Sequence, residues 1–212
     1  MRVIAVVLGL IILVPLAHGQ TAGMKKPARP VNTYSIVARD PVTGELGTAV
    51  QSHWFSVGSI VIWAEPGVGA VATQSFVEPS YGPLGLQLMR TGKSAGQALK
   101  SLLASDEHAD VRQVGMVDAN GNVANHTGVN SIAETCNLTG DNYAVQANMM
   151  WKPTVCSAMA AAFESGEGDL AERMMVALEA AQAEGGDARG KQSAAMLVVS
   201  GDIPAGLGWE RV

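Results

Sequence analysis

The order of strand-like and helix-like segments constrains the fold of this chain more than any other feature of its sequence. Four β-rich runs come first, at 34–39, 46–52, 59–63 and 68–74, and turn residues separate them. The later segments are a helix at 84–104 with a break at Gly92, strands at 113–117, 122–126 and 143–147, helices that begin near Pro153 and at Asp169, and a strand at 194–199. Runs of strands followed by runs of helices, with no β-α-β alternation, predict an α+β fold in which helices cover antiparallel sheets.

Local signals indicate where some of these segments begin and end. Asn120-Gly121 is a strong hairpin-turn signal between the strands at 113–117 and 122–126. Asp169 can cap the first amides of its helix while Glu172 reaches back, which is a capping box. The last strand, 194–199, is apolar without interruption, which predicts that it is buried on both faces.

The N-terminus has the pattern of a secretory signal peptide at residues 1–19. Arg2 supplies the positive charge, residues 3–16 form an apolar run, and Ala17-His18-Gly19 offers small residues for cleavage. The apolar run is shorter than the ~20 residues that span a bilayer, and an N-terminal core helix is the alternative. Residues 20–32 show no periodicity and are expected to be a linker or propeptide. We therefore expect a secreted or periplasmic protein, without a membrane span in its mature chain, whose domain covers 33–212.

The charge distribution argues against a nucleic-acid partner. The formal net charge is −5, and from Thr33 onward 10 basic residues face 19 acidic ones. Phosphate binding requires clustered lysine and arginine residues, which an acidic domain of this kind lacks. A homodimer is the default expectation for a fold of this kind.

Neither a metal site nor a cofactor site is predicted. Cys136 and Cys156 are the only cysteines, and in an oxidising compartment such a pair is interpreted first as a disulfide, with two buried thiols as the alternative. His53, His108 and His126 are scattered without the spacing of metal ligands. No glycine-rich phosphate loop opens a helix.

Five segments, in order along the chain, resemble the domain of unknown function 1028 family. They are TYSIVARD at 33–40, GAVATQ at 69–74, PSYG at 79–82, VQAN at 145–148 and GGDARGKQSA at 185–194. The family is grouped by resemblance with the N-terminal-nucleophile (Ntn) hydrolases. The resemblance therefore implies a four-layer αββα sandwich, with two antiparallel sheets between helix layers.

In Ntn hydrolases the first residue of the processed chain is the nucleophile, and the resemblance places this role on Thr33. A free α-amino group has a pKa of about 8, so it can act as the base for its own side chain. Because residues 1–32 precede Thr33, this role requires a cut between Asn32 and Thr33. The alternative is that Thr33 is an ordinary β-forming residue at the start of a strand.

The resemblance also places other polar residues near the nucleophile. Ser52 and His53 end the second strand and are expected to support Thr33 or to contact substrate, although His53 also suits an ordinary strand end. Asn148 is expected to donate to an oxyanion, with a turn asparagine as the alternative. The other expected substrate-binding residues lie in the matching segments; they are Arg39, Gln74, Tyr81, Asp187, Arg189, Gln192 and Ser193. For the last four, a helix-end loop with a surface ion pair is the alternative.

These expectations lead to two functions. The first is an exported Ntn-type hydrolase, an amidohydrolase or peptidase without a cofactor, that cleaves amide bonds of small-molecule or peptide substrates. The second is a catalytically silent exported domain of the same fold that binds a ligand or cell-wall material.

Overall fold

The computed structural model describes residues 30–31 and 33–202. The predicted signal peptide and most of the predicted linker lie outside the described residues. The strands are β1 (Pro30–Val31), β2 (Thr33–Arg39), β3 (Leu46–Ser52), β4 (Ile62–Glu65), β5 (Gly69–Phe76), β6 (Arg112–Asp118), β7 (Val123–Thr127), β8 (Cys136–Gly140), β9 (Tyr143–Asn148) and β10 (Ser193–Val199). The helices are α1 (Gly58–Val61), α2 (Tyr81–Arg90), α3 (Ala95–Ser105), α4 (Val155–Ser165) and α5 (Leu170–Ala183).

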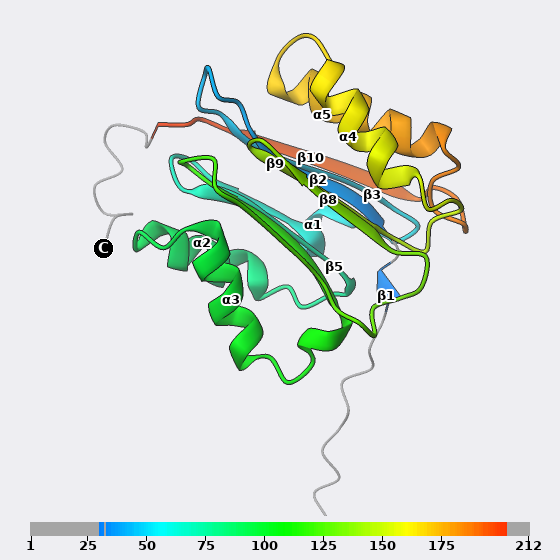
Figure 1. Cartoon of the computed structure of the whole chain (residues 1–212), viewed down its shortest axis with the longest axis horizontal. Coiled ribbons are helices and arrows are strands. Elements are labelled where there is room, and N and C mark those ends of the chain that lie inside the picture. The colour runs from blue at the N-terminus through cyan, green and yellow to red at the C-terminus, as the bar shows by residue number, and fades with distance from the viewer. Residues whose placement is uncertain (1–29, 32, 203–212) are drawn as a thin grey trace, which may run out of the picture.

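The strands form two antiparallel sheets, so the predicted α+β class is confirmed. Sheet A has the order β1-β5-β6-β7, and β4 also pairs with β5. Sheet B has the order β10-β3-β2-β9-β8. The two sheets face each other, with α2 and α3 on the outer face of sheet A and α4 and α5 on that of sheet B (Figure 1).

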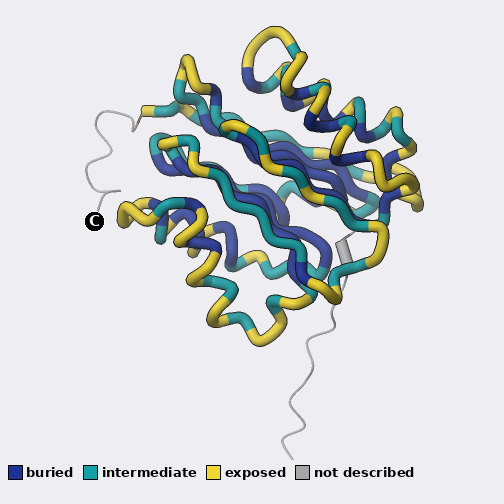
Figure 2. Tube along the Cα trace, viewed as in Figure 1, coloured by how far each residue is buried: buried dark blue, intermediate teal, exposed yellow. Residues whose placement is uncertain are grey.

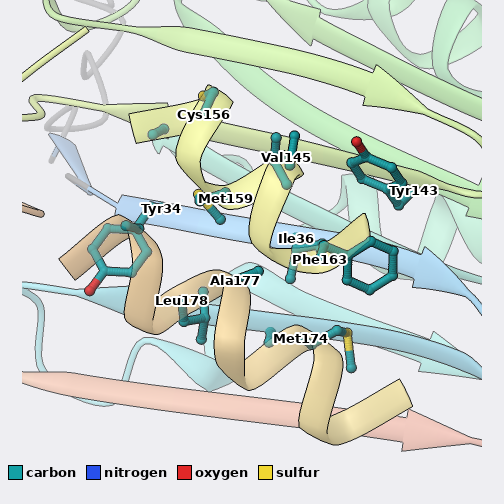
Figure 3. Packing of buried hydrophobic residues seen from close by; sticks show 14 of the residues in the cluster. Tyr34, Ile36, Tyr143, Val145, Cys156, Met159, Phe163, Met174, Ala177 and Leu178 are labelled. Atoms are coloured by element: carbon teal, nitrogen blue, oxygen red, sulfur yellow. The ribbon is translucent and has the colours of Figure 1, made fainter. Parts of the chain in front are cut away.

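Alternation along the strands divides the hydrophobic core into three parts. Tyr34 and Ile36 point from β2 toward α4 and α5, where Met159 and Met174 cover them (Figure 3). Val37, next in the chain, points the other way and packs between the sheets. A third cluster lies between sheet A and its helices. The strands in the middle of the molecule are therefore mostly buried, while the helices expose their outer faces (Figure 2).

The predicted caps and turns form. Asp169 accepts from the main-chain N–H of Glu172 at 2.9 Å, and the Glu172 carboxylate accepts from the N–H of Asp169, which completes the capping box of α5. Gly121, with φ of 81°, forms the turn between β6 and β7. The break at Gly92 separates α2 from α3. Cys136 in β8 and Cys156 in α4 form a disulfide that ties one edge of sheet B to its helix layer.

Two expectations about the elements were wrong, and one strand was missed. The run at 59–63 is not one strand, because Gly58–Val61 forms the helical turn α1 and β4 begins only at Ile62. Strand β10 is not buried on both faces, because it lies at an edge of sheet B and leaves Leu197 37% exposed. Strand β8 was not predicted, since its polar sequence, CNLTG, has no apolar run.

Among the described residues, no helix is both long enough and apolar enough to cross a membrane.

Candidate functional site

Four polar residues form a row across one end of sheet B. Ser193, Ser52, Thr33 and Asn148 are successive cross-strand partners on β10, β3, β2 and β9. Their side chains face sheet A, because their neighbours Tyr34 and Ala147 pack on the helix side. The hairpin β2–β3 and the return of β9 beside β2 therefore bring together residues that are far apart in the sequence.

Thr33 sits in the centre of this row and is fully buried. Its hydroxyl donates to Ser52 Oγ at 3.1 Å. Its main-chain carbonyl accepts from Gln74 Nε2 of the opposite sheet at 3.2 Å. Both Thr33 and Ser52 are 0% exposed. The nucleophile expected from the sequence is thus held by contacts from both sheets.

Three amide side chains join the two sheets beside Thr33. Gln113, from β6, accepts through Oε1 from Gln74 Nε2 at 2.8 Å and from Asn148 Nδ2 at 3.0 Å. Its own Nε2 donates to the main-chain carbonyl of Ala147 at 3.0 Å. Gln74, Gln113 and Asn148 are each 0% exposed. These contacts fix the Asn148 amide and the Thr33 carbonyl relative to one another.

The orientation of Asn148 differs from the expected one. Its Nδ2, the predicted oxyanion donor, is used by Gln113. Its Oδ1 is buried and makes no hydrogen bond within the described part of the chain. Asn148 therefore presents a hydrogen-bond acceptor, rather than a donor, beside Thr33.

A second group of polar side chains, buried except for the half-buried Asn125, continues the network away from Thr33. Ser35 donates to Gln74 Oε1 at 2.6 Å and accepts from Gln146 Nε2 at 2.8 Å. Asn125 Nδ2 donates to Gln146 Oε1 at 3.2 Å. Gly115 lies under the Gln146 amide, where a Cβ would overlap it, so glycine gives this amide its space.

The loop between α5 and β10 covers the end of sheet B. The main-chain N–H of Ala188 donates to Met149 O, and that of Gln192 donates to Ser52 O, both at 3.1 Å. Because β2 lies between β3 and β9, the loop spans the end of β2 at which Thr33 lies. Gln192 and Arg189 are themselves exposed.

Asp187 anchors this loop. Its carboxylate accepts from the main-chain N–H of His53 at 3.2 Å and from Arg189 Nη2 at 3.1 Å. The Asp187 side chain is 0% exposed and the Arg189 side chain is 32% exposed, so the carboxylate of this ion pair is buried while the guanidinium reaches solvent. Burial, together with the nearby Asp187 charge, raises the pKa of the Tyr34 phenol above its usual range.

His53 and Ser193 also lie at this end. His53 Nδ1 is buried and makes no hydrogen bond within the residues the structure describes. Ser193 Oγ donates to Trp54 O at 2.6 Å and accepts from the N–H of Val57 at 3.0 Å. Ser193 therefore holds the segment that follows β3.

The structure places two predicted residues elsewhere. Arg39 is at the opposite end of β2, about 20 Å along the strand from Thr33, and its guanidinium contacts Asn142 Oδ1 at 3.5 Å. Tyr81 is the first residue of α2, on the outer side of sheet A, and its hydroxyl donates to Asp106 Oδ2 at 3.0 Å. Neither residue takes part in the site at Thr33.

Sequence reasoning missed Gln113, Gln146 and Ser35. For Gln113 the signal was a polar residue at an otherwise apolar strand position, whereas Ser35 and Gln146 lie in the segments TYSIVARD and VQAN that resemble the family. The backbone on either side of this network is also unusual. Ser75 and Met149, which follow Gln74 and Asn148, have positive φ values of 68° and 55°. Such conformations are costly for residues other than glycine and tend to cluster at functional sites.

The described residues contain no group of three or more histidine, cysteine, aspartate or glutamate side chains arranged to hold a metal ion.

Comparison with known proteins identifies a family. Residues 33–209 match the model of a family of unknown function, DUF1028. The crystal structure of protein SPO2555 from Silicibacter pomeroyi, which carries the same family assignment, is similar at 30% identity with a TM-score of 0.75; the match covers 82% of this chain and 78% of that one. No curated protein matches the chain. The chain therefore belongs to the DUF1028 family.

Proposed function

We propose that the chain is an exported Ntn-type hydrolase that cleaves amide or peptide bonds through Thr33. The observation that carries the proposal is the row at the end of sheet B, where Thr33 lies between Ser52 and Asn148. The layer order in Figure 1, helices, sheet, sheet and helices, is that expected of a four-layer Ntn sandwich and supports the proposal.

The proposed first event is a cut of the chain between Asn32 and Thr33. Thr33 Oγ1 attacks the carbonyl carbon of Asn32 and forms an ester, the C–N bond breaks, and the hydroxyl proton passes to the departing nitrogen, which becomes the new primary amine. Water then hydrolyses the resulting ester, which leaves a carboxylate on Asn32 and restores the Thr33 hydroxyl. Ser52 Oγ, which accepts from this hydroxyl at 3.1 Å, is suited to orient Oγ1 for the attack.

The freed amine then acts as the base for each turnover. An α-amino group has a pKa of about 8, so about a tenth of it is in the neutral, basic form at pH 7. Asn148 Oδ1 belongs to the residue paired with Thr33 and is a buried acceptor with no hydrogen bond within the described residues. We assign to it the role of accepting from the Thr33 amine. Donors other than Asn148 Nδ2 must then stabilise the oxyanion, because Nδ2 donates to Gln113 Oε1.

Two features support export. The predicted signal peptide precedes the domain, and the disulfide between Cys136 and Cys156 suits an oxidising compartment. Both also fit the second function, an exported domain that binds a ligand or cell-wall material. One observation favours that second function: Thr33 is 0% exposed and follows strand β1, so the uncut chain presents no nucleophile to solvent.

The N-terminal sequence and intact mass of the secreted protein test the proposal. Thr48, which is also buried in sheet B, provides a matched control. We expect the wild type and Thr48→Ala to begin at Thr33, whereas Thr33→Ala keeps the Asn32–Thr33 bond and Thr33→Ser recovers the cut. If all four proteins begin near Gln20, the nucleophile mechanism is wrong and the binding function takes its place.

A further inference from the structure

Strand β1 occupies a short edge of sheet A immediately before Thr33. Its two residues pair antiparallel with β5, with Pro30 opposite Phe76 and Val31 opposite Ser75. The other edge of β5 is filled by β6. Strand β4 pairs with the same edge as β1, but only from Gly69 to Ala72. Beyond Ala72, the strand that pairs with this edge of β5 is therefore β1 (Figure 1).

A cut between Asn32 and Thr33 would sever β1 from the domain it pairs with. A strand of two residues makes few hydrogen bonds, so once cut it would bind only weakly and exchange with other extended chains. Its departure would open the edge of β5 around Ser75 and Phe76, where main-chain groups that had bonded to β1 lose their partners, and an unpaired strand edge is a template for another extended chain.

From this arrangement we propose that the vacated edge of β5 binds the acyl side of an extended peptide substrate. The inference rests on the proposed function. The substrate backbone takes the place of β1, runs antiparallel to β5, and delivers the carbonyl of its scissile amide to Thr33. Strand addition of this kind gives affinity through main-chain hydrogen bonds and is largely independent of side chains.

Strand β5 is built to align the two reactants. Its residues 75–76 hold the incoming chain, while Gln74, the preceding residue, donates to the Thr33 carbonyl at 3.2 Å. The end of β5 is itself fixed, because Arg112 Nη1 donates to Phe76 O at 2.6 Å and the N–H of Ile132 donates to Ser75 Oγ at 3.3 Å. A single rigid strand therefore sets the distance between substrate and nucleophile.

The direction of β1 defines the class of substrate. Because β1 runs antiparallel to β5, a substrate that takes its place would extend its N-terminal side past Phe76, away from the end of β4. The substrate therefore needs at least two residues before the scissile bond, and its N-terminus can lie well outside the site. This favours cleavage within peptides over removal of single N-terminal residues or hydrolysis of small amides.

The test separates binding from catalysis. In a Thr33→Ala chain, residues 29–32 are replaced by the recognition sequence of a site-specific protease, and the folded protein is cut before residue 33. A fluorescent peptide with the sequence of residues 20–32 is then added, and its binding is followed by anisotropy. Hydrogen exchange of the Ser75 and Phe76 amides locates the bound peptide. The control peptide is N-methylated at residues 31 and 32, so that whichever amide faces β5 is blocked.

We expect the peptide to bind the cut protein and to slow exchange at Ser75 and Phe76. The N-methylated peptide should bind about tenfold more weakly, because one main-chain hydrogen bond is lost. The uncut Thr33→Ala chain, in which β1 fills the edge, should bind neither peptide. Equal binding of both peptides, protection elsewhere, or no binding at about 1 mM peptide overturns the inference.

These outcomes are distinct from a failure of the proposed function. A wild-type chain that is never cut before Thr33 overturns the function, whatever the engineered protein binds. A wild-type enzyme that is cut and active, but whose β5 edge gains no protection, overturns only the inference about the edge.

Discussion

Replacing Gln113 with leucine should destabilise the protein more than any exposed substitution, although Gln113 is not a predicted catalytic residue. Its side chain is 0% exposed and bonds at both ends. The Oε1 atom accepts from Gln74 and Asn148, at 2.8 and 3.0 Å, and Nε2 donates to Ala147 O at 3.0 Å. Leucine has a similar volume but can make none of these bonds.

The magnitude follows from which partners lose their bonds. Asn148 Nδ2 loses its acceptor and remains buried, whereas Gln74 Nε2 keeps the Thr33 carbonyl. A buried polar group left without a partner costs about 1–3 kcal/mol. The Ala147 carbonyl also loses the hydrogen bond that it accepts from Gln113. The expected loss in free energy of unfolding is therefore about 2–4 kcal/mol. This is a large share of the ~5–15 kcal/mol that stabilises a typical domain.

Guanidinium unfolding with the disulfide intact, followed by tryptophan fluorescence, measures this loss. The exposed Gln87→Leu substitution on α2 is the matched control and should change the free energy of unfolding by less than about 0.5 kcal/mol. Asn148→Leu and the double variant complete a mutant cycle. Because the double variant removes both partners, its loss should fall below the sum of the single losses by about 1–3 kcal/mol. A Gln113→Leu protein as stable as the control, or a strictly additive cycle, would refute the reasoning.

Three further predictions test the packing and electrostatics away from the site. Replacing both disulfide cysteines with serine should lower the free energy of unfolding by about 3 kcal/mol, since the bond joins residues 20 apart; an unchanged unfolding midpoint would contradict this. Burial alone would raise the pKa of Asp106, but its hydrogen bonds and the Arg112 charge lower that pKa overall. The stabilisation by Asp106 is therefore present above its unfolded pKa of about 3.9 and lost as pH falls through the lower folded value, so Asp106→Asn should flatten the acid limb of a stability–pH curve. Gly82→Ala places a Cβ against the Trp63 ring and should cost about 1–3 kcal/mol, whereas Gly96→Ala, in open space on α3, should gain about 0.5–1 kcal/mol; thermal unfolding would expose a reversed order.

Part of the site was predictable because it depends on one hairpin. Strands 34–39 and 46–52 follow each other closely, so any antiparallel pairing brings Thr33 toward Ser52, as the register confirms. Asn148 required a longer inference, from resemblance, because 115 residues separate it from Thr33. Gln113 was not predicted because a polar residue in a short strand is ordinarily interpreted as facing solvent. Gln113 is buried only because sheet B packs against this face of sheet A.

The elements that were misjudged show the same limit. An uninterrupted apolar run such as 194–199 indicates burial, yet β10 lies at the edge of its sheet because no described strand pairs with its outer side. Conversely, β8 has polar residues at alternate positions and joins the sheet through β9 and the disulfide. Position in a sheet is a property of the pairing partners, which hydrophobicity along one strand does not specify.

The space between the sheets differs at its two ends, and this difference bears on function. Away from Thr33 it is filled by apolar side chains such as Val37, Leu46 and Val117. Near Thr33 it is filled by buried amides that bond to one another across the sheets. An apolar filling would hold two sheets together equally well, and buried polar groups become a liability wherever a partner is missing. Stability alone therefore gives no reason for this cluster. What the cluster adds is orientation: it holds the Thr33 carbonyl and leaves Asn148 Oδ1 as a buried acceptor next to Thr33, which the proposed reaction requires and a packed core does not.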